Sequence, residues 1–217
     1  MSPAGSLRVA EIFYSLQGES RSAGFPTVFV RLTGCPLRCG YCDTHYAFRG
    51  GEEMSLNAII SRAAEFDTGY VTVTGGEPLA QAHTLGLLAG LCDAGFTEVS
   101  LETCGALDIS SVDQRVVKVM DLKTPGSGEM ERNCYENILH LGCRDQVKFV
   151  LCNRADYDWA KRCLAEYELV SRCEVLFSPA ANLLEPVVLA DWILEDRLTV
   201  RFQLQLHKLL WGNEPGR

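Results

Sequence analysis

The chain alternates short apolar, β-branched segments with longer segments whose apolar residues recur at helical spacing. This pattern predicts seven strands, at 27–32, 70–74, 98–102, 116–121, 146–151, 174–177 and 199–206. It also predicts five helices, at 56–65, 79–94, 133–141, 155–169 and 186–194. Strands that alternate with helices form right-handed βαβ units, so we expect an α/β fold with mostly parallel strands. A closed eight-stranded barrel usually needs about 250 residues. With 217 residues and seven predicted strands, a single domain over 1–217 therefore favours a partial, open barrel.

The last predicted strand shows a pattern of its own. Apolar residues alternate there with Arg201, Gln203, Gln205 and His207, so one face of the strand is polar. Two interpretations remain open: an edge strand with one face in solvent, or a strand that presents its polar face to a binding site.

Composition and charge narrow the class of protein. With 47% hydrophobic and 22% charged residues the chain has the composition of a globular protein and not of a disordered one. Its 20 Lys and Arg against 28 Asp and Glu give a net charge of -8, which argues against nucleic-acid binding. No apolar segment approaches the roughly 20 residues that cross a membrane, and residues 1–10 lack the apolar core of a secretion signal. We expect a cytoplasmic protein that contacts neither membrane nor nucleic acid.

Ten cysteines are the unusual feature of the composition. Cytosolic thiols stay reduced, so most of them should be packing residues or metal ligands and not disulfides. Cys35, Cys39 and Cys42 form C-x3-C-x2-C, a spacing that lets one loop place three thiolates around a soft metal centre. Three interpretations remain open at this point. They are a zinc site completed by His45, a ferredoxin-like cluster with a fourth distant cysteine, and a 4Fe–4S cluster with one iron open to another ligand.

A second motif, Thr74-Gly75-Gly76-Glu77-Pro78, follows the second predicted strand. The glycines allow the backbone to approach a ligand, and the Glu77 carboxylate could accept hydrogen bonds from an amino group. A turn before a helix that begins at Pro78 would explain the same residues structurally. Because the carboxyl ends of parallel strands meet at one edge, we expect this motif to lie beside the cysteine triplet.

These two motifs, in this order, resemble those of the radical S-adenosylmethionine (SAM) enzymes. Six short segments, at 15–19, 29–32, 42–44, 73–78, 101–103 and 205–208, further resemble the 7-carboxy-7-deazaguanine synthase family within that superfamily. The resemblance implies a partial, open (βα)6-type barrel, that is, a shortened radical SAM core. In it Cys35, Cys39 and Cys42 would hold a 4Fe–4S cluster whose open iron binds SAM. Reduction of SAM would release a 5′-deoxyadenosyl radical. The implied reaction is ring contraction of 6-carboxy-5,6,7,8-tetrahydropterin with loss of ammonia, in queuosine and 7-deazapurine biosynthesis. It also implies Mg2+, a flavodoxin-like electron donor and a homodimer.

The resemblance implies roles for individual residues as well. Thr44 would bind Mg2+ through its hydroxyl, and Arg31 would pair with the substrate carboxylate. The residues implied to contact the pterin are Leu16, Gln17, Gly18, Glu19, Arg31, Thr74 and His207. Those implied to contact SAM are Tyr41, Cys42, Asp43, Gly76, Glu77, Glu102, Asp121, Leu122, Lys123 and Ser178.

Some positions depart from the family pattern. Many relatives read Ser-Pro-Lys where this chain has Asp121-Leu122-Lys123, and Gln-Pro where it has Ser178-Pro179. Segment 209–217 also extends further beyond His207 than in some relatives. Of the other cysteines, Cys104 follows the third predicted strand and could line the cavity, whereas the remaining six have no ligand spacing.

Two alternatives from other classes use the same residues. A glycyl-radical-enzyme activating enzyme shares the triplet and the Gly-Gly-Glu-Pro segment, but it would need a docking surface for a large protein partner. A zinc-stabilised binding module would use Cys35, Cys39, Cys42 and His45 and would have no enzymatic activity.

Overall fold

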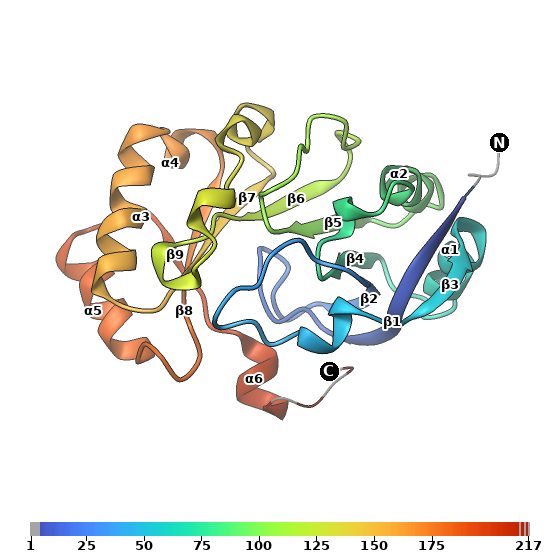
Figure 1. Ribbon diagram of the computed structural model, residues 1–217, viewed down its shortest axis with the longest axis horizontal. Helices are drawn as coiled ribbons and strands as arrows, with labels where there is room; N and C mark the ends of the chain where they lie inside the picture. The colour runs from blue at the N-terminus through green and yellow to red at the C-terminus, as the bar shows by residue number, and fades with distance from the viewer. Residues whose placement is uncertain (1–4, 213, 215, 217) are drawn as a thin grey trace.

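A nine-stranded sheet forms the centre of the protein in a computed structural model that describes residues 5–212, 214 and 216. The strand order is β3-β1-β2-β4-β5-β6-β7-β8-β9, and the sheet curves without closing (Figure 1). Its strands are β1 Ser6–Leu16, β2 Pro26–Leu32, β3 Glu52–Ser55, β4 Tyr70–Gly75, β5 Glu98–Thr103, β6 Val117–Asp121, β7 Gln146–Leu151, β8 Glu174–Pro179 and β9 Arg201–Phe202.

The connections between the strands are mostly helical. The α-helices are α1 Leu56–Ala64, α2 Thr84–Asp93, α3 Arg154–Glu166, α4 Leu169–Arg172, α5 Pro186–Glu195 and α6 Leu206–Trp211. Short 3-10 helices are η1 His45–Phe48, η2 Pro78–Ala80, η3 Pro125–Ser127, η4 Met130–Arg132 and η5 Tyr135–His140. No helix among these residues has the length and apolar character needed to cross a membrane.

Seven neighbouring strands, β2 and β4 to β9, run parallel, and β1 pairs antiparallel with both β2 and β3. The prediction of a mostly parallel, open α/β barrel is therefore confirmed. In Figure 1 the longer helices α1, α2, α3 and α5 lie outside the sheet, whereas α6 lies apart from them at the bottom of the view.

The central strands divide their residues between two faces. One face packs against the helices as the main hydrophobic core, with Val28, Val30 and Leu32 of β2, Val71 and Val73 of β4, Val99 and Leu101 of β5, and Val147, Phe149 and Leu151 of β7. Because side chains alternate along a strand, the residues between them point to the opposite face. That face carries Phe29 and Arg31, Thr72 and Thr74, Ser100 and Glu102, and Lys148 and Val150. A sheet with a continuous apolar face can thus keep a polar inner face.

Local sequence signals account for the helix boundaries. Ser55 caps α1 by accepting a hydrogen bond from the Ala58 amide, and Asn153 caps α3 in the same way with Asp156. Pro186 occupies the first turn of α5, where its missing amide hydrogen costs no helical bond.

The structure corrects several predicted elements. The sequence pattern missed β1 and β3, and it predicted one helix over 79–94, where η2 and α2 are separated by a turn. Segment 133–141 contains the 3-10 helix η5 and no α-helix. Of the predicted strand over 199–206, only Arg201–Phe202 forms a strand. The Leu206 amide donates to the Gly18 carbonyl oxygen at 3.0 Å, and this contact turns the chain into α6 instead of extending β9.

Candidate functional site

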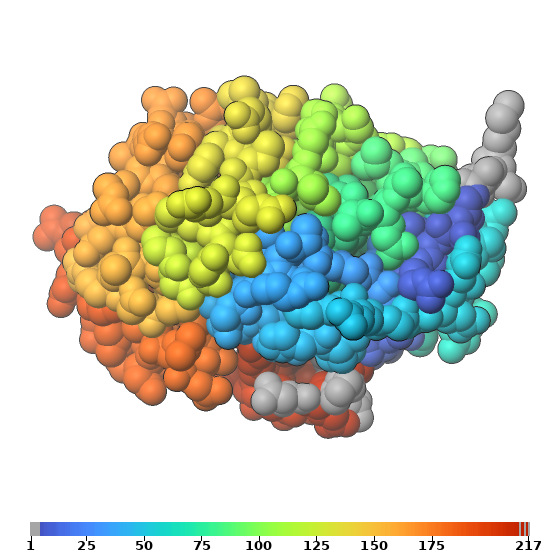
Figure 2. Space-filling view, viewed as in Figure 1, coloured from blue at the N-terminus to red at the C-terminus, as the bar shows by residue number. Residues whose placement is uncertain are grey.

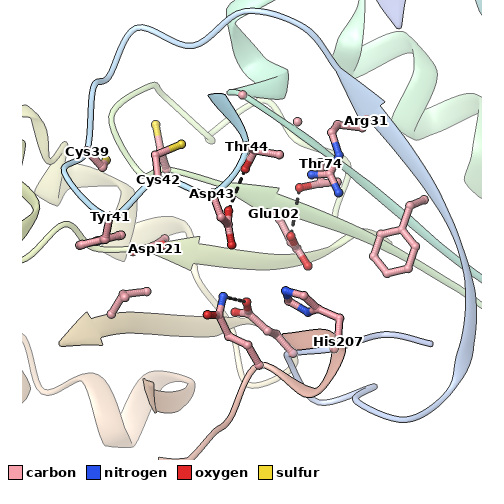
Figure 3. Close-up of a pocket in the computed structure, with 18 of the residues that line it drawn as sticks. Arg31, Cys39, Tyr41, Cys42, Asp43, Thr44, Thr74, Glu102, Asp121 and His207 are labelled. Atoms are coloured by element: carbon pink, nitrogen blue, oxygen red, sulfur yellow. Dashed lines mark hydrogen bonds between the residues drawn. The ribbon is translucent and has the colours of Figure 1, made fainter. Parts of the chain in front are cut away.

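A cavity of about 330 Å3 opens on the polar face of the sheet, where the loops after β1, β2, β4, β5 and β6 meet. Figure 3 shows Cys39 and Cys42 on one side of this pocket, His207 on the opposite side, and Glu102 between them. Of the residues predicted to form the site, the structure brings to its wall Leu16, Gln17, Gly18, Glu19, Arg31, Cys35, Cys39, Tyr41, Cys42, Asp43, Thr44, Thr74, Gly76, Glu102, Asp121, Lys123 and His207.

The three clustered cysteines lie on one loop after β2, residues 33–44, which we call the cysteine loop. Their side chains are free thiols of intermediate burial. Gly40 donates its amide to Ser127 at 3.0 Å, and the Leu37 amide donates to Cys35 Sγ at 3.4 Å. Burial raises the pKa values of the Cys35 and Cys39 thiols, and the nearby Lys123 ammonium acts in the opposite direction. Three free thiols that line one pocket match the thiolate donors of a 4Fe–4S cluster with one iron left open to another ligand, so these residues fit that group.

The loop after β4 is fastened directly to the cysteine loop. The Gly76 amide donates to the Leu32 carbonyl at 3.1 Å, and the Glu77 amide donates to the Gly34 carbonyl at 2.7 Å. A Cβ at position 76 would overlap the Gly34 carbonyl and approach the Cys35 side chain. Only glycine at position 76 lets these two loops lie together, so the two sequence motifs meet as expected.

Beside the cysteine loop, the end of β6 brings charged groups and polar atoms without a hydrogen-bond partner to the pocket. Lys123 Nζ lies 2.9 Å from Asp121 Oδ2 and 5.8 Å from the centre of the Tyr41 ring. Burial alone would lower the pKa of Lys123, but the Asp121 carboxylate raises it above its usual value. Among the described residues, the Tyr41 hydroxyl and Asp121 Oδ1 have no hydrogen-bond partner. Buried polar atoms of this kind call for a polar ligand, and they fit a cofactor such as SAM that carries hydroxyl and amino groups.

Glu102 is the hub of a hydrogen-bonded network in the middle of the pocket. Its two carboxylate oxygens accept from Gln17 Nε2 at 3.3 Å and from Thr74 Oγ1 at 3.0 Å. Gln17 Nε2 also donates to Thr72 Oγ1 at 3.1 Å. The structure thus ties Glu102, predicted on the SAM side, to two residues predicted on the pterin side.

Arg31 packs against two aromatic rings near the C-terminal end of β2. Its Nε donates to Glu11 Oε1 at 2.7 Å, and the Tyr46 hydroxyl donates to the same oxygen at 2.8 Å. The guanidinium carbon lies 5.6 Å from the centre of the Phe13 ring and 5.9 Å from that of Tyr46. With Nε used by Glu11, the terminal N–H groups remain to bind an anion in the pocket.

Glu19 enters the pocket from the loop after β1 and meets Lys148, which the sequence patterns did not identify, and Gln205, which belongs to the polar face of the last predicted strand. Lys148 Nζ lies 2.6 Å from Glu19 Oε2, and Gln205 Nε2 donates to Glu19 Oε1 at 2.8 Å. Gln205 and His207 flank the start of α6, so His207 reaches the pocket from a helix and not from the predicted strand.

Oxygen donors lie side by side at the end of the cysteine loop. The Thr44 hydroxyl donates to Asp43 Oδ1 at 3.0 Å, and Lys208 Nζ lies 2.7 Å from Asp43 Oδ2. Burial would raise the pKa of Asp43, but the Lys208 charge and hydrogen bonds from Lys208 and Thr44 lower it to about 2. A hydroxyl beside an ionised carboxylate suits a hard cation such as Mg2+. Figure 2 shows the red C-terminal segment packed below the segment that carries these residues.

Three residues predicted to contact SAM do not reach the pocket wall. Leu122 is fully buried in the hydrophobic core. Ser178 is also buried and is not part of the pocket lining, and its hydroxyl is among the described side-chain atoms without a hydrogen-bond partner. Glu77 is fully buried, and its carboxylate accepts from the Leu79 and Cys104 amides and from the Thr103 hydroxyl. Glu77 therefore ties the end of β4 to the end of β5 instead of presenting a free oxygen to an amino group.

Other pocket residues had no separate signal in the sequence. They include Phe13, Tyr46, Phe48, Lys148 and the C-terminal Gly212, Glu214 and Gly216. Cys104 lines the pocket as expected. Residues 1–4, 213, 215 and 217, which the domain prediction includes, lie outside the described residues. The zinc alternative requires Cys35, Cys39, Cys42 and His45 to converge on one ion. His45 does not line the pocket that the three cysteines face.

Comparison with known proteins links this geometry to a family. Residues 29–121 match the radical SAM superfamily model. A 7-carboxy-7-deazaguanine synthase from Chlorobaculum tepidum is 48% identical, with 98% of this chain and 97% of the relative covered. Another from Koribacter versatilis is 40% identical, with 96% and 98% covered. The crystal structure of QueE from Escherichia coli has a TM-score of 0.75 at 20% identity and covers 93% of this chain and 95% of that one. At that identity it supports the fold alone. None of these matches favours an activating enzyme or a zinc module.

Proposed function

The chain belongs to the 7-carboxy-7-deazaguanine synthase family of radical SAM enzymes, and we propose that it converts 6-carboxy-5,6,7,8-tetrahydropterin to 7-carboxy-7-deazaguanine with release of ammonia. The product is a precursor of queuosine and other 7-deazapurines. The observation that carries the proposal is one pocket with three free thiols on one side and carboxylate, amide and guanidinium groups on the other.

The cofactor half of the pocket is formed by the cysteine loop and the ends of β4 and β6. Cys35, Cys39 and Cys42 would hold a 4Fe–4S cluster, and Gly76 would let SAM approach beside it. The cluster and SAM supply the one-electron chemistry that starts the reaction when they are bound. The remaining SAM contacts in the proposal come from Tyr41, Asp43, Glu102, Asp121 and Lys123.

The substrate half matches a flat 2-amino-4-oxopyrimidine ring that carries a carboxylate. Gln17 and Glu19 offer amide and carboxylate groups to the ring edge, and His207 closes the opposite side. Arg31, with Nε fixed by Glu11, would clamp the substrate carboxylate through its terminal N–H groups. Leu16, Gly18 and Thr74 complete the contacts. These residues would orient the substrate and exclude water from it.

Further parts of the proposal concern ions and partners. Thr44 would bind Mg2+ through its hydroxyl, with the substrate carboxylate as a shared ligand. The electron donor would be flavodoxin-like, and the protein would act as a single-domain radical SAM core in a cytoplasmic homodimer. It would bind neither a membrane nor nucleic acid, in agreement with its net charge of -8.

The test uses protein reconstituted with iron and sulfide without oxygen. SAM, a chemical reductant, Mg2+ and 6-carboxy-5,6,7,8-tetrahydropterin are added, and 7-carboxy-7-deazaguanine, ammonia and 5′-deoxyadenosine are quantified. We expect the product and ammonia in equal amounts. SAM cleavage with no deazaguanine product would contradict the substrate and leave the superfamily assignment intact. A colourless protein with about one zinc per chain would contradict both.

A further inference from the structure

Lys148 places one ammonium group between carboxylates from two sides of the pocket. Its Nζ lies 2.6 Å from Glu19 Oε2 and 3.8 Å from Asp121 Oδ2. The side chains of Lys148 and Glu19 are 13% and 12% exposed, so water screens their attraction little. A long cationic side chain on the inner face of β7 therefore has one main partner, which is Glu19.

Glu19 is fixed from several directions. Lys148 donates to Oε2, Gln205 donates to Oε1 at 2.8 Å, and the Glu19 amide donates to Gln17 Oε1 at 3.2 Å. Each carboxylate oxygen can accept two hydrogen bonds and receives one from these side chains. The remaining acceptor sites are available to a ligand that presents N–H groups.

We propose that Lys148 is a positioning residue for the substrate, which holds Glu19 ionised and in one orientation so that Glu19 accepts N–H bonds from the pterin ring edge. The inference rests on the proposed function, because that function supplies the ring. It assigns a role to a residue that neither sequence motif contains. Lys148 acts through Glu19 and does not itself react.

The groups that face this pair support the direction of the effect. His207 on α6 and Gln205 face Glu19, whereas Asp121 on β6 and Glu102 on β5 face Lys148. Burial, the largest effect, would raise the pKa of Glu19, but Lys148 reverses it, with help from Gln205 and His207, and lowers that pKa below 4.5. Without Lys148, burial dominates, and a buried carboxyl with a raised pKa becomes protonated more easily.

The test measures equilibrium binding of 6-carboxy-5,6,7,8-tetrahydropterin to the cluster-loaded protein by anaerobic dialysis between about pH 5 and about pH 8. The variants are Lys148→Met, Lys148→Gln, Lys148→Arg, Glu19→Gln and the Lys148→Met/Glu19→Gln double variant. Lys118→Met is the matched control. Lys118 lies on β6 and forms a similarly buried ion pair with Asp145 (Nζ to Oδ2, 3.0 Å), but it does not line the pocket.

We expect Lys148→Met and Lys148→Gln to weaken binding about 10- to 100-fold near pH 7.5, and Lys148→Arg to restore most of it. The ratio of wild-type to Lys148→Met affinity should grow as pH falls. Because Asp121 and Glu102 also face Lys148, the Glu19→Gln background shows how much of that ratio comes from Glu19. In the Glu19→Gln background, Lys148→Met should change affinity less than about threefold. Lys118→Met should keep wild-type affinity.

The possible outcomes distinguish a failure of this inference from a failure of the proposed function. A wild-type protein that neither binds nor converts the pterin contradicts the proposed function. A wild-type protein that does both, with Lys148→Met and Glu19→Gln effects that simply add, contradicts the role of Lys148. A constant affinity ratio across pH does so as well. If Lys148→Met does not fold, Lys148→Gln and Lys148→Arg carry the same comparison, and equal binding by these two contradicts the inference.

Discussion

The His207 ring lies so close to the Gly18 Cα that a Cβ at position 18 would overlap its Nδ1 atom. The same glycine also accepts a hydrogen bond from the Leu206 amide through its carbonyl oxygen, at 3.0 Å. Gly18 therefore contacts both the backbone of α6, at Leu206, and the His207 side chain where that helix begins. Absence of a side chain at one loop position fixes how closely the C-terminal helix covers the pocket.

Gly18→Ala should displace His207 and the start of α6 away from the loop after β1. A displacement of about 1 Å in a binding group can reduce turnover about 100-fold, so we expect kcat/KM to fall between 10- and 100-fold. Steady-state kinetics with varied pterin measures this. Gly142→Ala is the control, because a Cβ there meets only Asp145 Oδ2 at 3.8 Å outside the pocket. Wild-type kinetics for Gly18→Ala would show that His207 does not contact the substrate.

The cysteine loop gives a prediction about iron content. Cys39→Ala removes one of the three thiols that face the pocket, and it should reduce bound iron and sulfide and lower activity more than about 100-fold. Cys143→Ala is the matched control, because Cys143 is exposed and lies outside the pocket lining. Iron and sulfide analysis after reconstitution provides the measurement. Full cluster content in Cys39→Ala would contradict the ligand assignment.

The contact between Glu11 and Arg31 predicts a difference between two conservative variants. Arg31→Lys retains the charge but loses the planar fork that can bind a carboxylate at two points, so KM for the pterin should rise about 10-fold or more. Glu11→Gln keeps the size but frees the guanidinium to rotate, and a smaller rise in KM should follow.

The matched control is Arg21→Lys, since Arg21 pairs with Glu98 outside the pocket. Its KM should equal that of the wild type. Equal KM values for Arg31→Lys and the wild type would mean that the substrate carboxylate binds elsewhere.

The fold could be predicted from the sequence where local and tertiary preferences agree. β7 was predicted residue for residue, because Val147, Phe149 and Leu151 pack on the helices while the β-branched character of the segment favours a strand. The alternation over 199–206 predicted a strand of which only Arg201–Phe202 forms. There a contact distant in sequence, Leu206 with Gly18, outweighs the period-2 pattern.

The functional site shows the same contrast between residues that local sequence identifies and residues that only contacts distant in sequence bring together. Cysteines and glycines at fixed spacing identify their own loop, so the pairing of the two motifs could be predicted. Lys148 could not, because it appears in the sequence as an ordinary polar residue of a strand, and only the strand order brings it to Glu19, 129 residues away. Glu77 shows the reverse: its motif suggested a ligand contact, whereas tertiary contacts use all of its carboxylate.

The proximity of Thr44 to Asp43 predicts a metal-dependent phenotype. Thr44→Ala should raise the Mg2+ concentration for half-maximal activity about 10-fold, whereas Thr44→Ser, which keeps the hydroxyl, should resemble the wild type. Titration of activity with Mg2+ after treatment with a chelator measures both. Identical titrations for the Thr44→Ala and wild-type proteins would contradict the assignment of the ion to this hydroxyl.

The Glu19–Lys148 pair also predicts how stability depends on pH. In the wild type the pKa of Glu19 is lowered on folding. Its stabilising contribution is therefore present above about pH 4.5 and is lost as the pH falls through the lower folded value. In Lys148→Met the direction reverses, because burial now raises the pKa of Glu19 above its unfolded value. The unpaired carboxylate then destabilises the protein at neutral pH, and protonation relieves it as pH falls.

Lys148→Met should accordingly lower the free energy of unfolding by about 3 kcal/mol near pH 7.5, the scale for breaking a buried ion pair, and by less near pH 5. Denaturant unfolding under reducing, oxygen-free conditions measures the difference at each pH. In the Glu19→Gln background, where no carboxyl remains to be protonated, the same substitution should cost an amount that does not change over this range. A cost that is constant with pH in the wild-type background, or that grows on acidification, would show that Lys148 does not control the ionisation of Glu19.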